Sequence, residues 1–102
     1  MSMEILEQDE YKYGKTLANR ILGLLDEHNI TVYRLHTLSE ISDNSLEKLV
    51  QGKTKNPKLS TIHAIAMAFN MSVSEFLNFQ EMDDITYADL RKLKPQNNDE
   101  NE

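Results

Sequence analysis

The sequence predicts a single small domain of the all-α class. Apolar residues recur every three or four positions through most of the chain, the spacing that places them on one face of a helix. Only three glycines and two prolines occur in 102 residues, which argues against strands joined by tight turns. A chain of this length buries only a modest core, so we expect one folding unit.

Five helices and one further short helix are expected from this spacing. Their predicted bounds are 14–28, 32–38, 43–51, 61–69 and 72–77, followed by 87–94. Asn29 and Gly52 stand at helix ends that favour a left-handed backbone, and Asn70 ends the fourth helix. Ser72 and Glu75 have the spacing of a capping box. The expected core lies on the inner helix faces: Leu17, Ile21, Leu24, Leu35, Ile41, Leu46, Leu49, Leu59, Ile62, Ile65, Ala66, Phe69, Val73, Phe76 and Leu77.

Residues 31–53 hold two short helices joined by a tight corner. Thr31 and Ser42 each precede a helix, where their side chains can accept a hydrogen bond from the free amides of the first turn. The inward stripes are Val32, Leu35 and Leu38 in the first helix and Leu46, Leu49 and Val50 in the second. The outward residues of the second helix are Asp43, Asn44, Glu47, Lys48 and Gln51. This arrangement is typical of a helix-turn-helix unit that inserts its second helix into DNA.

From about residue 17 to residue 77 the sequence resembles the phage repressor and Cro family of helix-turn-helix domains, also called the XRE family. Four segments carry the resemblance, in this order: the two capped helices ending in Gln51-Gly52-Lys53, the loop 54–59, the helix 60–69 and the run 70–77. The resemblance implies a five-helix, lambda-repressor-like domain over residues 13–79. Around it we expect an acidic N-terminal extension over 1–12 and a C-terminal extension over 80–102, with a short helix and a disordered acidic tail.

Two positions depart from the family's pattern. Many members have a partly buried Arg–Glu ion pair where this sequence has Leu25 and Val50, and we expect these two apolar residues to pack together. Glu40 occupies the place in the interhelical turn where the family usually has Gly. A non-Gly residue in the left-handed region costs roughly 1 kcal/mol, so either the strain is tolerated or the turn is remodelled.

The charge is distributed unevenly along the chain. The formal net charge is −6, to which residues 1–11 contribute −4, residues 12–79 contribute +2 and residues 80–102 contribute −4. Four lysines and no acid occur between residues 48 and 58, directly after the start of the second helix of the motif. The part of the chain that carries the motif is therefore mildly basic, which suits contact with DNA phosphates.

The resemblance implies which side chains would read DNA bases. The first residues and the next outward turn of the recognition helix 43–51 would face base edges in the major groove. The candidates are Asp43, Asn44, Ser45 and Lys48. Asn44 can bond adenine N6 and N7, Lys48 can donate to guanine O6 or N7, and Asp43 can accept from cytosine N4. Asp43 has a second interpretation without DNA, because an acid in the first turn stabilises the helix dipole.

Phosphate contacts are expected from two segments. The candidates are Thr31, Val32, Tyr33 and Arg34 at the start of one helix, and Lys53, Lys55, Asn56 and Lys58 in the loop after the recognition helix. A solvated loop is the alternative for the lysines. One small domain binds one half of an operator weakly, so we expect a homodimer on a two-fold symmetric operator. His63 and Met67, one helical turn apart, are the candidate dimer contacts, with cover by the chain's own extensions as the alternative.

Other site chemistries find no support in the sequence. The chain has no Cys, and none of its three histidines has a second ligand at a recognised metal spacing, so we expect no disulfide, metal or cofactor. The sequence has neither a Gly-rich phosphate loop nor a nucleophile elbow, so an enzyme is not expected. No apolar run approaches the roughly 20 residues of a membrane span. The acidic first residues lack a signal peptide's basic region, so we expect a cytoplasmic protein with no membrane contact.

The sequence thus predicts a transcriptional regulator that binds specific sequences of double-stranded DNA, most simply a repressor that occupies a promoter. Two alternatives remain on the same fold. The first is a protein-interaction module, which the acidic ends together with Asp43 and Glu47 favour. The second is an antitoxin or restriction-control protein, which binds DNA and also a protein partner such as a toxin.

Overall fold

The computed structural model describes residues 10–93, and the regular secondary structure in that part of the chain is helical throughout. In chain order the helices are α2 (Lys12–His28), α3 (Val32–Ser39), α4 (Asp43–Val50), α5 (Leu59–Ala68), α6 (Val73–Leu77), α7 (Gln80–Asp83) and α8 (Tyr87–Arg91). The prediction of an all-α domain is confirmed. The predicted acidic tail and most of the N-terminal extension lie outside the described residues.

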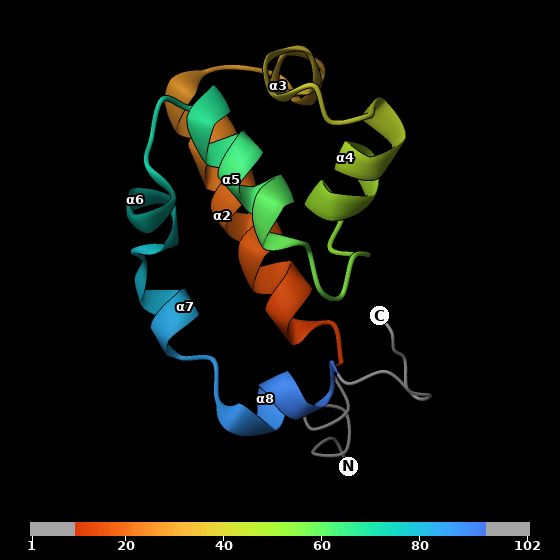
Figure 1. Ribbon diagram of the computed structural model, residues 1–102, viewed down its shortest axis with the longest axis vertical. Coiled ribbons are helices and arrows are strands. Elements are labelled where there is room, and N and C mark those ends of the chain that lie inside the picture. Colours follow the sequence, from red (N-terminus) through yellow and green to blue (C-terminus); the bar gives the residue numbers. More distant parts are fainter. Residues whose placement is uncertain (1–9, 94–102) are drawn as a thin grey trace.

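The longest helix, α2, is the axis around which the other helices are arranged (Figure 1). Helix α4 packs on one side of α2, whereas α6 and α7 lie on the other side. Helix α5 contacts both α3 and α6, and α8 packs near the N-terminal end of α2. The recognition helix predicted from the sequence therefore lies at one edge of the molecule, away from the C-terminal helices.

A single hydrophobic core joins these helices. Its most deeply buried side chains are Leu17, Ile21, Leu35, Leu46, Ile65 and Phe76. Among the described residues no polar or charged side chain is buried. The predicted core residues are buried or partly buried except Leu59, for which the prediction is wrong, because 66% of its surface is exposed. The inward position predicted for Leu38 is also wrong, since 42% of its surface is exposed. Leu59 is the first residue of α5, and it lies on the outward face of that helix.

Leu25 and Val50 belong to the same core cluster, and only 6% and 8% of their surfaces are exposed. One lies on α2 and the other on α4, two helices that pack against each other. This agrees with the expectation that they take the place of the family's ion pair. Two apolar side chains there require no desolvation of charge, so this part of the junction between α2 and α4 consists of apolar packing.

Hydrogen-bonded caps begin the helices where the sequence predicts them. Thr31 Oγ1 accepts from the backbone N–H of Arg34 at 3.0 Å, and Ser42 accepts in the same way at the start of α4. Ser72 and Glu75 form the predicted capping box of α6. Left-handed residues follow the ends of four helices: Asn29, Glu40, Gly52 and Asn70, with φ of 56°, 64°, 75° and 63°.

Some helix bounds differ from the predicted ones. Both α2 and α5 begin two residues earlier than expected, at Lys12 and Leu59. The residue before α5 is Lys58, which makes no side-chain cap, so the usual sequence signal of a helix start is missing there. The four-residue helix α7 was not predicted, because one turn is too short to show an apolar period.

Arg20 fastens the C-terminal helices to α2. Its Nε donates to the carbonyl oxygen of Phe76 at 2.8 Å, and its Nη2 donates to that of Glu75 at 3.0 Å. The guanidinium group also lies 5.6 Å from the ring centroid of Phe76 and 5.0 Å from that of Phe79. Arg20 thus satisfies carbonyls at the C-terminal end of α6 while stacking on two aromatic rings.

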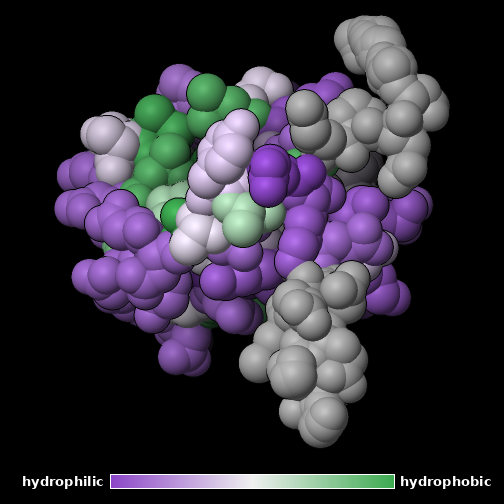
Figure 2. Space-filling model, turned by 90° about the horizontal axis from the view of Figure 1, so that it is seen from below, coloured by the Kyte–Doolittle hydropathy of each residue, from purple (hydrophilic) through white to green (hydrophobic). Residues whose placement is uncertain are grey.

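Helix α8 is tied to the start of α2 by an ion pair. Lys12 Nζ lies 3.2 Å from Asp89 Oδ2. The hydrogen bond from the Thr86 backbone N–H lowers the pKa of the Asp89 carboxyl, burial opposes this shift, and Lys12 adds to it. Figure 2 views the molecule from this end and shows a mostly hydrophilic surface with hydrophobic residues gathered in one patch. The C-terminal extension expected from the sequence is thus packed against α2 through residue 91.

The turn between α3 and α4 keeps its left-handed backbone although Glu replaces Gly. Glu40 has φ 64° and ψ 14°, and its N–H donates to the carbonyl of His36 at 3.0 Å. His36 Nδ1 donates to the carbonyl of Ile41 at 2.6 Å, and the Ile41 N–H donates to Ser39 Oγ at 3.2 Å. These bonds hold the turn, so the strain at Glu40 is tolerated and the turn is not remodelled.

Replacing Glu40 by Gly should therefore stabilise the fold. We expect Glu40→Gly to raise the free energy of unfolding by up to about 1 kcal/mol, because Gly enters the left-handed region without a steric penalty. Urea denaturation followed by circular dichroism measures the change. The control is Glu40→Ala, which removes the same carboxylate but keeps a Cβ and should bring no gain. Equal stabilisation by both variants would contradict backbone strain as the cause.

Candidate nucleic-acid interface

Helix α4 turns its polar face to solvent. Leu46, Leu49 and Val50 are buried, which fixes the rotation of the helix about its axis. The four candidate base-reading residues, Asp43, Asn44, Ser45 and Lys48, are all exposed. Because α4 lies at the edge of the molecule, no other described helix covers this face (Figure 1). The helix is therefore placed so that its first two turns can enter the groove of a nucleic-acid duplex.

A groove runs between α4 and the loop that follows it. It has a volume of about 340 Å³, and its walls include Ser45 and Lys48 from α4 and Asn56 and Lys58 from the loop. Pro57, which is buried, anchors the loop. The structure thus brings together residues from the two groups that the sequence separates into base-reading and phosphate-binding candidates.

The start of α3 offers free backbone donors. The N–H of Arg34 is satisfied by Thr31 Oγ1, and that of Leu35 by the Thr31 carbonyl. The N–H groups of Val32 and Tyr33 have no hydrogen-bond acceptor among residues 10–93. Free donors at a helix N-terminus, where the helix dipole is positive, attract a phosphate. The Tyr33 side chain is 70% exposed beside them, whereas that of Val32 is half-buried against the core.

The lysines of the loop differ in their surroundings. Lys55 Nζ lies 3.6 Å from Glu10 Oε1 and 5.7 Å from the ring centroid of Tyr11. Lys48, Lys53 and Lys58 are exposed and form no ion pair with any residue that the structure describes. Three of the four lysines between residues 48 and 58 are therefore available to an anion, whereas Lys55 already has an acidic neighbour.

Gly14 positions this loop, a role that sequence reasoning missed. A Cβ at Gly14 would overlap the carbonyl oxygen of Thr54, so the start of α2 and the loop approach as closely as two backbones can. Gly52 gives a second close approach, because a Cβ there would lie 3.0 Å from Lys15 Cγ. Its φ of 75° also favours glycine. A glycine inside the first turn of an otherwise regular helix was the available sequence signal.

The candidate dimer residues lie on the outer face of α5. His63 is exposed, and 67% of the Met67 surface is exposed. Leu59 precedes His63 by four residues, as His63 precedes Met67, so the three side chains share one face of the helix. The role of this face in a dimer stays a prediction.

Other kinds of site are not seen in the described part of the chain. Residues 10–93 contain no group of three His, Cys, Asp or Glu side chains that could hold a metal ion. In the same range no helix has both the length and the apolar character needed to cross a membrane.

Comparison with protein families gives a match to the Cro/C1-type helix-turn-helix DNA-binding domain over residues 20–82. The chain belongs to this family. The matched range covers well over half of the chain and includes all of α3, α4 and α5 together with the loop between the last two. No curated protein and no solved structure matches the chain. The Cro/C1-type family consists of helix-turn-helix DNA-binding domains, and the two capped helices α3 and α4 lie within the matched range.

The close approach at Gly14 gives a test of how the interface is built. We expect Gly14→Ala to lower the free energy of unfolding by about 1–3 kcal/mol, since the added methyl group must displace the loop backbone or the start of α2. The matched control is Gly23→Ala in the same helix. A Cβ there meets no neighbouring atom, so this variant should be more stable by about 0.5–1 kcal/mol. Chemical denaturation of both variants measures the difference, and changes of the same sign would contradict the close approach.

Proposed function

We propose that this chain is a sequence-specific transcriptional regulator, a repressor that acts by occupying a two-fold symmetric operator as a homodimer. The observation that carries the proposal is the exposed polar face of α4 beside a loop with lysines and no acid. A helix of this kind reads base edges, while the lysines neutralise the phosphates on either side of the groove. Such a regulator needs no catalytic step and acts on the genome in the cytoplasm.

Base reading is assigned to the first two turns of α4. Asn44 can form two hydrogen bonds with adenine, and Lys48 can donate to guanine. Asp43 can accept from cytosine N4, and Ser45 can bond either partner of a pair. Asp43 and Glu47 also repel phosphates, so they disfavour a shifted docking of the helix and contribute to specificity by exclusion.

Phosphate binding is assigned to the two segments that flank α4. The free N–H groups of Val32 and Tyr33 face one strand, with Thr31 and Arg34 beside them. Lys53, Asn56 and Lys58 face the other strand from the loop. Lys55 joins them by exchanging the carboxylate of Glu10 for a phosphate, at a modest cost because an exposed ion pair is worth roughly 0–1 kcal/mol.

The outer face of α5 is assigned to the dimer. Leu59, His63 and Met67 form an exposed stripe with two apolar members, and contact with a second copy removes them from water. The stripe begins directly after the lysine loop, so a dimer formed through it keeps both loops close to one DNA duplex. Two α4 helices related by a two-fold axis then read two half-sites about one DNA turn apart.

Two lysine variants test the DNA-binding assignments. On duplexes selected from a random pool, Lys48→Gln should relax the preference at one base pair by about 1–3 kcal/mol. Lys58→Gln should instead weaken binding to all DNA sequences alike and reduce the slope of log affinity against log salt by about 0.9. Fluorescence anisotropy over a range of salt concentrations measures both. Arg91→Gln on α8 is the control and should bind as the wild type does; absence of binding at low salt would refute the function itself.

A charge placed on α5 tests the dimer. Met67→Glu should weaken self-association about tenfold or more, which corresponds to 1.4 kcal/mol, because a carboxylate would lose its hydration in the interface. Analytical ultracentrifugation gives the dissociation constant. Tyr87→Glu is the control, since Tyr87 is 75% exposed but lies on α8. A wild-type monomer at micromolar concentration, or equal effects of both variants, would exclude α5 as the interface.

A further inference from the structure

Gly23 lies in the middle of α2, and packing within the chain does not explain its presence. A Cβ added at this position would meet no neighbouring heavy atom within 4 Å. Glycine in a helix interior is less stable than alanine, because it loses more conformational freedom and buries no side chain. The backbone at Gly23 is therefore open to approach from outside, although nothing in the described residues approaches it.

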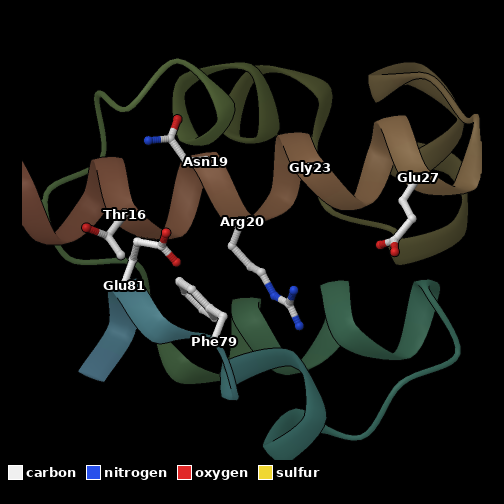
Figure 3. A pocket seen from close by; sticks show the side chains of 7 residues that line it. All are labelled: Thr16, Asn19, Arg20, Gly23, Glu27, Phe79 and Glu81. Atoms are coloured by element: carbon white, nitrogen blue, oxygen red, sulfur yellow. The ribbon is translucent and has the colours of Figure 1, made fainter. Parts of the chain in front are cut away.

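Gly23 forms part of the wall of a groove between α2 and α7 (Figure 3). The groove has a volume of about 360 Å³ and is open to solvent. Figure 3 shows Glu81 toward one end of the groove and Glu27 toward the other, with Arg20 and Gly23 between them along α2. The missing side chain at Gly23 thus widens the groove in the stretch between two carboxylates.

The central wall of the groove is held in place by Arg20. Its hydrogen bonds to α6 carbonyls, at 2.8 and 3.0 Å, use Nε and Nη2, and its Cζ lies 5.0 Å from the Phe79 ring centroid. Its Nη1 makes no hydrogen bond with a described residue. This wall of the groove is therefore preformed, and the two N–H groups of Nη1 are unused at a residue that lines the groove.

The charge on this side of the molecule favours a cationic occupant. Glu27 and Glu81 make no ion pair or hydrogen bond with any described residue. Residues 59–90 contain five acids and neither Lys nor Arg. The charge of Arg20 is directed at the carbonyl end of α6, where it offsets the negative end of the helix. The α7 side is thus anionic, opposite in sign to the lysine loop beside α4.

We propose that this groove binds an extended, basic segment of a partner protein. Lys or Arg side chains of the segment pair with Glu27 and Glu81, a backbone carbonyl of the segment accepts from Arg20 Nη1, and the segment's main chain lies against Gly23. A polyamine offers cations without carbonyls, so it uses only the carboxylates and leaves Arg20 unsatisfied. A peptide matches both features of the groove.

The partner and DNA occupy different sides of the molecule. Helix α4 and helix α7 lie on opposite sides of α2 (Figure 1). The same chain can therefore bind the segment and a DNA duplex at once. Any effect of partner binding on α4 is transmitted through α2, which lies between the two sites. This inference goes beyond the proposed function and does not depend on it, because the groove contains none of the residues assigned to DNA.

The binding test uses the full chain and a synthetic peptide of alternating Lys and Leu. In a nuclear magnetic resonance titration, we expect shifts at the amides of residues 16–27 and 79–81 and at Arg20 Nε. Gly23→Leu fills the groove and should weaken peptide binding about tenfold or more. Glu27→Gln with Glu81→Gln should weaken it similarly. The matched control is Asp43→Asn with Glu47→Gln, which changes the net charge equally on the DNA side.

Each outcome decides the proposal. Loss of binding in the groove variants with retention in the control supports it. Equal loss in both double variants overturns it, because attraction to overall charge would then suffice. Unchanged binding by Gly23→Leu also overturns it, as does spermine binding to the same residues as tightly as the peptide. If Gly23→Leu does not fold, as judged by circular dichroism, the two double variants decide. In a gel-shift assay, the Gly23 and Glu variants should bind DNA as the wild type does. Failure of the DNA-binding function is therefore distinguished from failure of the peptide-binding proposal.

Discussion

The burial of α4 against α2 is the interaction on which the rest of the structure depends. A helix of eight residues is not stable alone in water. Helix α4 forms because Leu46, Leu49 and Val50 leave water, and burial of one such side chain contributes about 1.5–3 kcal/mol. The same three residues fix the rotation of the helix, so the outward position of its polar face is a consequence of core packing.

The core achieves this without buried charge in residues 10–93. Where relatives often place an ion pair between these helices, Leu25 and Val50 make an apolar junction that requires no precise geometry of charges. The position of the lysine loop depends instead on the close backbone contact at Gly14, where the loop packs directly on the start of α2. The core and the lysine loop are thus coupled through one helix.

Helix α2 also separates two surfaces of unlike charge. The lysines between residues 48 and 58 lie on the side of α4, whereas the acids of residues 59–90 accompany α6, α7 and α8. An acidic chain can therefore present a basic surface to DNA, because fields of exposed charges fall off over about 10 Å in ordinary salt. Arg20 maintains the separation by fastening α6 to α2 and by turning its own charge inward to backbone carbonyls.

The sequence by itself determined the features that depend on neighbouring residues: the caps at Thr31 and Ser42, the left-handed ends at Asn29 and Gly52, and the outward face of α4. These follow from local hydrogen bonds and helical period. Only the tertiary structure decided the exposure of Leu59, the close approach at Gly14, the pairing of Lys55 with Glu10 and the groove beside Gly23. Each of these joins or exposes segments far apart in the chain, and local period contains no information about which segments meet in space.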